Sequence, residues 1–517
     1  MRVEQFLRDS RRRCPEKIAV VAGDRRLTFR EIDDASDRLA AALIRRGVMR
    51  GDRVVIFMDN RWEAVVGIFA ALKAGAVFSP INPSTKAEKL AYMLKNCRAS
   101  AVITLEALSS VARDAMAQAP SVKLAVVTGA AGKPALAGGI RFEEAVTEPD
   151  AAPLLDAAGI ELDLAMLIYT SGSTGFPKGV MMTHQNIVAA ASSITSYLEN
   201  MPDDIILNVL PISFDYGLYQ VLMAMRVGAT LVLEKSFAFP QAILNRIAAE
   251  KVTGLPLVPT MAAMLLQMKD LQPGAYPHIR YITNTAAALP PAHIARLQEL
   301  FPGTRIYSMY GVTECKRCTY LPPGELVKRP GSVGIAIPGT EAYVVDDAGE
   351  RVSPGTVGEL VIRGPHVMKG YWEDPAATDR ALRPGAFPWE KVLHTGDLFR
   401  ADEEGFLYFV ARKDDIIKTR GEKVSPKEIE NVLYALAGIR EAAVIGVPDA
   451  ILGMAIKAVV VSTNAAMTEQ DVIRQCAKHL EEFMIPKFVE FRDALPKTDS
   501  GKISRRLIDA QPVETAE

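Results

Sequence analysis

The sequence predicts an α/β protein of at least two domains, a large N-terminal one and a small C-terminal one. Three observations lead to this prediction. The 517 residues exceed what one hydrophobic core usually holds. A hydrophobic content of 49% is enough for large cores and excludes a disordered chain. Helix and strand patterns alternate along most of the chain, which indicates helices layered on largely buried sheets.

The alternation begins near the N-terminus. Residues 37–46 show the apolar spacing of a helix, residues 53–58 form an apolar run typical of a strand, and residues 62–72 predict a second helix. Residues 129–156 are rich in Ala, Gly and Pro and have little periodicity, so we expect a surface connection there.

The composition changes near Arg412, where the run ARKDDIIKTRGEKVSP is dense in charge. Beyond it, residues 441–449 and 457–462 predict strands and residues 469–483 predict an amphipathic helix, which together indicate a compact βαβ-like unit. We therefore expect a boundary at this point, with domains at residues 1–411 and 412–517.

The charge balance gives no global field, because 60 Lys and Arg residues face 61 acidic residues. Nucleic acid and anionic membranes are therefore not expected partners, and an anionic ligand must be held by local groups. Five cysteines, an odd number, fit reduced thiols better than a disulfide framework. The N-terminus lacks the apolar stretch of a secretory signal, and the most apolar window, residues 64–78, is too short to span a bilayer. We expect a cytoplasmic protein without a membrane span.

The most informative segment is LAMLIYTSGSTGFPKGVMMTHQNIVAA, residues 164–190. Its apolar start predicts a buried strand that ends near Tyr169, and its end predicts a helix that begins near Thr183. Between them lie glycines whose N–H groups can approach a phosphate, several hydroxyl donors and one lysine. We predict that phosphates are bound by Thr170, Ser171, Gly172, Ser173, Thr174, Gly175 and Lys178.

An ordinary P-loop is excluded. That pattern requires Gly-Lys-Ser/Thr, and here the lysine stands in Phe176-Pro177-Lys178-Gly179. A flexible linker is the other alternative, but a linker would not need the flanking strand and helix. We therefore favour a phosphate-binding loop of another kind.

TSGSTGFPKGV followed by Thr183-His184 resembles the adenylate-forming superfamily, which comprises acyl-CoA synthetases, adenylation domains of peptide synthetases and luciferases. The resemblance covers nearly the whole chain, because the family's other motifs follow in the family's order. They are YGVTE (310–314), GELVIRGPHVMKGYW (358–372), TGD (395–397), ARKDDIIKTRGEK (411–423) and PKTDSGKISRR (496–506). Each motif is weak alone, and the ordered set is specific.

The resemblance implies an N-terminal domain of layered α/β subdomains plus a β-barrel-like portion, and a mobile α+β lid as the C-terminal domain. It implies an AMP-forming acid–thiol ligase that activates a carboxylic acid with ATP to an acyl-adenylate and transfers the acyl group to CoA. The alternative is a stand-alone adenylation enzyme that loads an amino or carboxylic acid onto the phosphopantetheine of a separate carrier protein. A catalytically silent relative is disfavoured by the presence of Lys178, Glu314, Asp397 and Lys502.

In the first step of that reaction two anions, a carboxylate and the α-phosphate of ATP, must meet, so cations and oriented donors are required. By resemblance, the loop holds the β- and γ-phosphates, Glu314 binds Mg²⁺ and Thr313 contacts the α-phosphate. Lys502 would reach the α-phosphate and the attacking carboxylate. Asp397 would accept the ribose hydroxyls, and the remaining nucleotide-binding positions implied are Tyr310, Gly311 and Arg412.

Lys502 would occupy the path of the thiol, and the family resolves this by rotating the C-terminal domain between half-reactions. Asp414 matches the family's hinge position. After rotation, Lys418 and the strip 420–423, which includes Gly421, are expected to help form the pantetheine tunnel. A charged linker is the alternative for this strip.

The choice of acid depends on LPISFDYGLYQ, residues 210–220. Phe214-Asp215 resembles the adenylation domains, whose aspartate binds a substrate amine, whereas many acyl-CoA synthetases carry histidine there. Alternatively, Asp215 caps a helix or pairs with a nearby cation. His184 either shapes the acyl pocket or is a packed histidine at a helix start. The other lining residues expected by resemblance are Tyr216, Tyr219, Thr283, Asn284, Thr285 and Met309.

Cys315-Lys316-Arg317-Cys318 has the spacing of a pair of zinc ligands. No second ligand pair lies nearby in the sequence, so we expect no metal there. The sequences of residues 210–220 and of MYGVTECKR also resemble those of free-standing bacterial acyl-CoA ligases of the exosortase-associated type.

Overall fold

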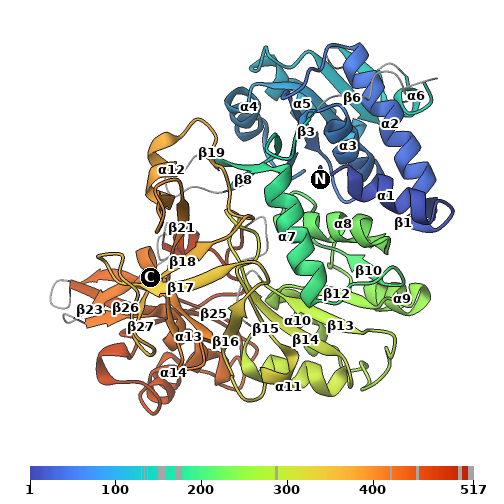
Figure 1. Ribbon diagram of the computed structural model, residues 1–517. Coiled ribbons are helices and arrows are strands. Elements are labelled where there is room, and N and C mark those ends of the chain that lie inside the picture. The colour runs from blue at the N-terminus through green and yellow to red at the C-terminus, as the bar shows by residue number, and fades with distance from the viewer. Residues whose placement is uncertain are drawn as a thin grey trace.

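The computed structural model describes residues 1–129, 131–132, 134, 136, 138–148, 159–170, 177–285, 289–419, 422–449, 453–498 and 503–509. Within them the strands form three sheets, of eight, fourteen and five strands. Figure 1 shows helix α7 (His184–Tyr197) running between the two larger sheets. The C-terminal strands lie at the end of the molecule opposite α1 (Gln5–Arg13) and α2 (Phe29–Arg45). The prediction of an α/β fold with a small C-terminal unit is confirmed.

The eight-stranded sheet carries the segment that contains the predicted phosphate loop. Its strands are β3 (Arg53–Phe57), β4 (Val77–Ile81), β5 (Ala99–Leu105), β6 (Leu124–Thr128), β7 (Gly139–Arg141), β8 (Leu164–Thr170), β9 (Lys178–Thr183) and β19 (Gly370–Tyr371). The order is β19-β9-β8-β4-β3-β5-β6-β7, parallel from β8 to β7, whereas β9 and β19 are antiparallel to their neighbours. Alternate residues of β3 enter different apolar clusters, Val54 and Ile56 on one face and Val55 and Phe57 on the other. Helices α3 (Trp62–Lys73), α4 (Ala87–Asn96) and α5 (Ser109–Ala117) cover these faces, so both are buried.

Helix α2 begins earlier than the predicted helix at 37–46. Thr28 caps it, because its Oγ1 accepts a hydrogen bond from the Glu31 N–H (3.2 Å) while the Glu31 carboxylate accepts one from the Thr28 N–H (2.7 Å). The apolar spacing marked only the second half of this helix. The predicted surface connection at 129–156 is wrong in part, because β7 and the short α6 (Phe142–Ala145) lie there and Phe142 is fully buried against Trp62.

The fourteen-stranded sheet has a parallel half and an antiparallel half. The parallel half contains β1 (Ile18–Ala22), β10 (Ile205–Asn208), β11 (Thr230–Leu233), β12 (Gly254–Leu257), β13 (Tyr281–Asn284) and β14 (Arg305–Tyr310), with β2 (Arg25–Thr28) antiparallel to β1. The antiparallel half contains β15 (Thr319–Leu321), β16 (Ser332–Ala336), β17 (Glu341–Val345), β18 (Gly358–Arg363), β20 (Leu382–Pro384), β21 (Lys391–Ala401) and β22 (Leu407–Arg412). The associated helices are α8 (Asp215–Val227), α9 (Pro240–Glu250), α10 (Pro259–Leu266), α11 (Pro291–Leu300) and α12 (Pro375–Ala381).

The prediction of a β-barrel-like portion is corrected by the order of these strands. Strand β16 pairs with β15 on one side and with β22 on the other, so the antiparallel strands extend the sheet instead of closing on themselves. The described residues therefore contain an open sheet that begins at β17 and ends at β2, and no closed barrel.

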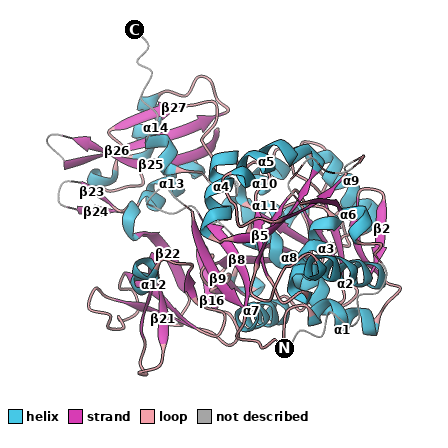
Figure 2. Cartoon of the chain, turned by 90° about the horizontal axis from the view of Figure 1, so that it is seen from above, coloured by secondary structure: helices cyan, strands magenta, loops and turns pink. Residues whose placement is uncertain are grey.

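The third sheet is formed by β23 (Ile417–Thr419), β24 (Glu422–Val424), β25 (Ile439–Asp449), β26 (Gly453–Ser462) and β27 (Phe488–Phe491). Helix α14 (Glu469–Cys476) connects β26 to the parallel β27, which is the predicted βαβ unit, although the helix ends earlier than the predicted residue 483. Helices α13 (Pro426–Ala435) and α15 (Arg505–Asp509) complete this part, which Figure 2 shows set apart from α1 and α2. No helix in the described ranges is long and apolar enough to cross a membrane.

Candidate active site

The predicted phosphate loop connects the two strands of a hairpin. Strands β8 and β9 pair antiparallel with Thr170 opposite Lys178, so these two residues flank the loop on adjacent strands. The loop was expected to lead directly into a helix, and instead β9 intervenes. The remaining predicted phosphate-binding residues lie outside the described ranges, namely Ser171, Gly172, Ser173, Thr174 and Gly175.

Helix α7 begins after Thr183, as the sequence predicts. The Thr183 hydroxyl accepts a hydrogen bond from the Asn186 N–H (3.2 Å), and the Asn186 side chain accepts one from the Thr183 N–H (2.9 Å). His184 follows at the first helical position and is buried. Its Nδ1 accepts a hydrogen bond from the Val3 N–H (3.0 Å), and burial lowers its pKa to about 4. This neutral ring packs against the N-terminal segment, which favours the packed-histidine alternative over a place in the acyl pocket.

Three motifs that are far apart in the sequence meet around Glu314. The Tyr371 hydroxyl donates a hydrogen bond of 2.6 Å to Glu314 Oε1. The Lys178 ammonium lies 5.4 Å from the centre of the Tyr371 ring, in a cation–π contact. Strand β19 places Tyr371 opposite Val180 of β9, so the hairpin that carries Lys178 also positions the tyrosine. Tyr371 thus contacts a cation through its ring and a carboxylate through its hydroxyl.

The turn after β14 fixes the direction of Glu314. A Cβ at Gly311 would lie 1.9 Å from the Lys316 carbonyl oxygen, so only glycine fits there. The Met368 N–H donates a hydrogen bond of 2.7 Å to the Glu314 carbonyl oxygen. Lys316 has a φ of 69°, and its ammonium donates a hydrogen bond of 2.8 Å to the Thr313 carbonyl oxygen. The backbone that presents Thr313 and Glu314 is therefore held from both sides.

Asp397 is contacted by two of the residues predicted to act with it. The Tyr310 hydroxyl donates a hydrogen bond of 2.5 Å to Asp397 Oδ2, and Arg412 Nε lies 3.6 Å from Oδ1. Asp397 stands opposite Arg412 in the pairing of β21 and β22. Burial and the Asp397 charge hold the pKa of Tyr310 well above its usual value, so the phenol remains a hydrogen-bond donor. Asp397 is buried, whereas 60% of the Arg412 side chain is exposed.

Glu359 holds the turn that presents Asp397, a role that the sequence did not reveal. Gly396, just before Asp397, has a left-handed φ of 71°, and its N–H donates a hydrogen bond of 3.0 Å to Glu359 Oε1. His394 lies 3.4 Å from the other carboxylate oxygen. Burial opposes ionisation of Glu359, but the contacts with His394 and the Gly396 N–H lower its pKa to about 2. Its position within the GELVIRG motif was the only available signal.

The residues expected to line the acyl pocket gather between α8 and β13. The buried Tyr216 hydroxyl donates a hydrogen bond of 2.8 Å to the Thr283 carbonyl oxygen. Phe214 packs edge-on against Tyr216, with ring centres 6.4 Å apart. The other predicted lining residues are buried, namely Tyr219, Asn284, Thr285 and Met309.

Asp215 is the first residue of α8 and is buried. Burial lowers the pKa of Lys316, and the Asp215 carboxylate is the largest influence that opposes this lowering. Asp215 therefore already lies near a cation of the protein itself, one of the alternatives to the binding of a substrate amine.

Cys315 and Cys318 have the spacing of a pair of zinc ligands. The Sγ atoms of Cys315 and Cys318 lie 3.1 Å apart, and both thiols are free and buried. Across the described ranges, no group of three or more His, Cys, Asp or Glu side chains is placed to hold a metal ion.

The predicted hinge and tunnel residues occupy the link to the third sheet. Asp414 lies in a 3₁₀ turn (Lys413–Asp415) between β22 and β23, and Lys418 stands on β23 opposite Lys423. The side chains of Asp414 and Lys418 are not among those described. Gly421 and Lys502 lie outside the described residues altogether.

Arg505, from the motif that contains Lys502, ties the C-terminal helix to this link. It forms ion pairs with Asp415 (2.6 Å) and Glu430 (2.7 Å). Lys497 and Ile503 form an antiparallel bridge, so the two ends of the PKTDSGK segment meet.

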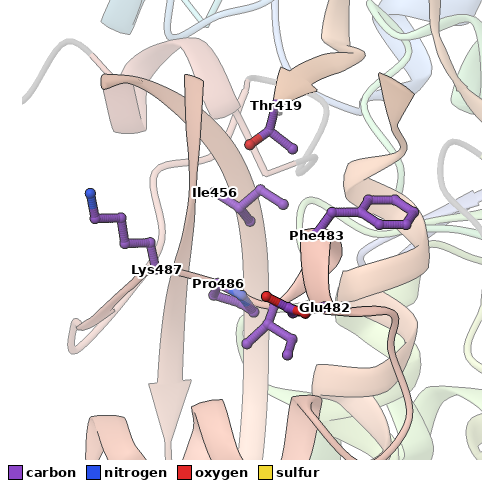
Figure 3. A pocket seen from close by; sticks show the side chains of 7 residues that line it. Thr419, Ile456, Glu482, Phe483, Pro486 and Lys487 are labelled. Atoms are coloured by element: carbon purple, nitrogen blue, oxygen red, sulfur yellow. The ribbon is translucent and has the colours of Figure 1, made fainter. Parts of the chain in front are cut away.

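A pocket of about 220 Å³ lies between the third sheet and residues 482–487, and none of these motifs except the strip 418–423 contributes to its lining. Figure 3 shows its lining, in which the Lys487 side chain points away from the Phe483 ring. The lining residues come from this part of the chain alone, namely Thr419, Ile456, Glu482, Phe483, Ile485, Pro486 and Lys487. It therefore does not belong to the site around Glu314 and Asp397.

Comparison with known proteins adds independent evidence. Residues 7–372 match the family described as AMP-binding enzyme, and residues 428–502 match the AMP-binding enzyme C-terminal domain. A long-chain-fatty-acid–CoA ligase of Bacillus subtilis (strain 168) is 32% identical over 542 residues, covering 99% of this chain and 95% of the relative. A feruloyl-CoA synthase of an Amycolatopsis species is 33% identical, covering 95% of each chain.

Solved structures agree with these relatives. The anthranilate CoA ligase AuaEII in complex with anthranoyl-AMP superposes with a TM-score of 0.89 at 27% identity, covering 99% of this chain and 97% of that one. ATP-bound MatB from Rhodopseudomonas palustris gives a TM-score of 0.88 at 29% identity, covering 98% of both chains. Sequence, fold and the clustering of the motifs agree, and the chain therefore belongs to the AMP-binding enzyme family, among its AMP-forming acyl-CoA ligases.

Proposed function

We propose that the enzyme activates a carboxylic acid with ATP to an acyl-adenylate and transfers the acyl group to the thiol of CoA. The observation that carries this proposal is the meeting of three distant motifs at Glu314, where Tyr371 and Lys178 converge. Relatives named as acyl-CoA ligases support the reaction class, and one solved relative is named as a complex with an acyl-AMP.

In the first half-reaction, a carboxylate oxygen of the acid attacks the α-phosphorus of ATP, and pyrophosphate leaves. We assign Lys178 and the phosphate loop to the β- and γ-phosphates, and Thr313 to the α-phosphate. Asp397, with Tyr310 and Arg412 beside it, would accept the ribose hydroxyls. Lys502 would bring a cation to the reacting carboxylate, because two anions approach each other there.

Magnesium fits the residues at Glu314. A metal there would find no cluster of three or more protein ligands among the described residues, so phosphates and water would have to supply the rest of its ligands. Mg²⁺ is commonly bound through one or two carboxylates together with substrate phosphates and water. When bound, it would neutralise charge on the triphosphate. Tyr371 would then orient the Glu314 carboxylate through its hydrogen bond.

In the second half-reaction, the thiol attacks the acyl carbonyl carbon and AMP leaves. We propose that residues 412–517 act as a lid that rotates about Asp414 between the two steps. The hinge assignment is supported by its position in a short 3₁₀ turn between the last strand of the large sheet and the first strand of the third sheet. The strip 418–423 would then help to form the pantetheine tunnel.

The experiment that tests this function is ATP–pyrophosphate exchange over a panel of acids, followed by thioester formation with CoA. Exchange with at least one acid and a thioester product are expected. If exchange occurs without transfer to CoA but with transfer to a phosphopantetheinylated carrier protein, the acceptor is the carrier protein and not CoA. ATP binding without exchange for any acid would identify a silent relative and contradict the proposal.

A further inference from the structure

Arg317 is a buried cation beside the predicted acyl pocket. Its exposed fraction is 3%, and its guanidinium carbon lies 4.6 Å from the centre of the Tyr216 ring. One nitrogen donates a hydrogen bond of 3.2 Å to the Lys316 carbonyl oxygen. Its Nε has no hydrogen-bond partner among the described residues, and no carboxylate of the described ranges forms an ion pair with it. Arginine is seldom buried in this way without a carboxylate partner.

Another buried cation of the chain shows the contrast. Lys73 donates hydrogen bonds to the Asp33 carbonyl oxygen (2.9 Å) and the Ser36 hydroxyl (2.7 Å), and it forms ion pairs with Asp33 (2.5 Å) and Asp37 (2.8 Å). The buried charge of Lys73 is therefore neutralised by carboxylates of the protein itself. Arg317 has no such set of partners, which points to a partner that is supplied from outside the chain.

Tyr219 provides a second donor at the same place. It follows Tyr216 by three positions on α8, so the two rings lie on one face of the helix. Its hydroxyl is buried and has no hydrogen-bond partner among the described residues. Arg317 lies against the ring of Tyr216, about one helical turn from Tyr219, and its charge opposes the rise in the pKa of Tyr219 that burial and Asp215 cause. One acceptor group could satisfy both donors.

The guanidinium of Arg317 is the charged group of this region that lacks a counter-charge. It is buried, its Nε has no hydrogen-bond partner, and neither Asp215 nor Glu314 forms an ion pair with it among the described residues. The Glu314 carboxylate is engaged by Tyr371 on the nucleotide side. A neutral ligand would leave the guanidinium without a counter-charge, whereas a carboxylate matches its planar fork of donors.

We propose that the acid activated by this enzyme carries a second carboxylate, which the Arg317 guanidinium and the Tyr219 hydroxyl bind. This inference rests on the proposed function and names its substrate class. The reacting carboxylate faces the nucleotide, and the second one lies at the far end of the pocket beneath Tyr216. Arg317 is therefore a specificity-determining residue. A site of this kind rejects an acid whose second carboxylate is masked, because the buried donors then remain unpaired.

The test is pyrophosphate exchange with matched pairs of acids, in which each dicarboxylic acid is compared with its own monomethyl ester. Aliphatic pairs of four to seven carbons and an aromatic pair, terephthalic acid and monomethyl terephthalate, cover the accessible lengths. The wild-type kcat/KM is expected to favour at least one dicarboxylic acid by about 100-fold or more. In Arg317→Met this ratio should fall to near one, mainly through a higher KM for the dicarboxylic acid, because methionine retains contact with the Tyr216 ring.

Two further variants separate recognition from folding. Arg317→Lys keeps the charge and should retain a reduced preference for the dicarboxylic acid. Arg280→Met removes another partly buried arginine, which is paired with Asp204 at 2.7 Å, and should alter stability without changing the ratio. Wild-type exchange that is faster with every monoester than with its parent acid would overturn the inference and leave the proposed function intact. Exchange with no acid of any class would instead overturn the proposed function. If Arg317→Met fails to fold, the kcat/KM ratio of dicarboxylic acid to monoester in the wild type and in Arg317→Lys tests the inference instead.

Discussion

The hydroxyl of Tyr371 and the carboxylate of Glu314 are joined by a hydrogen bond of 2.6 Å across 57 positions of sequence. The same tyrosine ring carries the Lys178 ammonium at 5.4 Å from its centre. Tyr371 therefore connects the lysine proposed to bind phosphate with the glutamate proposed to bind Mg²⁺. We consider it a positioning residue, since it would act through these two side chains.

Tyr371→Phe removes the hydrogen bond but keeps the ring beneath Lys178. A hydrogen bond to a charged group contributes roughly 1.5–3 kcal/mol, so the rate of pyrophosphate exchange should fall about tenfold or more. The Mg²⁺ concentration that gives half-maximal rate should rise, because the Glu314 carboxylate loses its orientation. A titration of exchange rate against Mg²⁺ measures both effects. Tyr343→Phe, a half-buried tyrosine stacked on Arg351, is the control and should leave both values unchanged. An unchanged Mg²⁺ dependence in Tyr371→Phe would exclude this positioning role.

The residue types of the motifs could be predicted from the sequence, and their contacts could not. The YGVTE and GYW motifs were recognised separately, but the contact between Glu314 and Tyr371 exists only because β19 docks on β9. The role of Glu359 is hidden for the same reason, since it depends on the pairing of β18 with β21. Such pairings are long-range and leave no local periodicity.

The fold shows the same limit. Helix α2 was predicted only where its apolar spacing was clear, because its first turns depend on the Thr28 cap. The barrel-like portion was wrong, because the neighbours of β16 cannot be read from its own residues. In the sequence, Arg317 is visible only as a residue between Cys315 and Cys318. That it is buried and lacks a carboxylate partner can be learned only from the structure.

Lys502→Ala should abolish adenylate formation and leave thiol transfer from a supplied acyl-adenylate largely intact. The expected loss in the first half-reaction is on the order of 10²–10³ in rate, the cost of removing one preorganised charge-stabilising group. Pyrophosphate exchange measures the first step, and single-turnover transfer from synthetic acyl-adenylate to CoA measures the second. Lys497→Ala, in the same motif and paired with Glu441 at 2.7 Å, is the control for general damage to the lid. Equal losses in both half-reactions would contradict the two arrangements of the lid.

Lys73→Met tests the buried ion-pair cluster between α2 and α3. Removing the ammonium leaves the buried Asp33 without its main partner, so the free energy of unfolding should fall by about 3–5 kcal/mol. Lys235→Met is the matched control, because Lys235 is exposed and lies 3.5 Å from Asp59. A surface pair of this kind contributes about 0–1 kcal/mol. Urea unfolding of both variants gives the comparison, and similar losses in the two would show that burial does not decide the cost.

Asp215→Ala decides between two roles for a buried carboxylate. If Asp215 balances the cation at Lys316, its removal should lower the free energy of unfolding by several kcal/mol, because a buried positive charge is left uncompensated. The ranking of acids in pyrophosphate exchange should then stay the same. If Asp215 instead binds a substrate ammonium, amino acids should outperform simple acids of equal size in the wild type, and the variant should lose that discrimination. We expect the first outcome, since Lys316 already stands near the carboxylate and a substrate amine would add a third positive charge to the same buried region.

Asp203→Ala, at an exposed position before β10, is the control for loss of a carboxylate without burial. An amino acid that is the best substrate of the wild type and loses its advantage in Asp215→Ala would contradict this expectation.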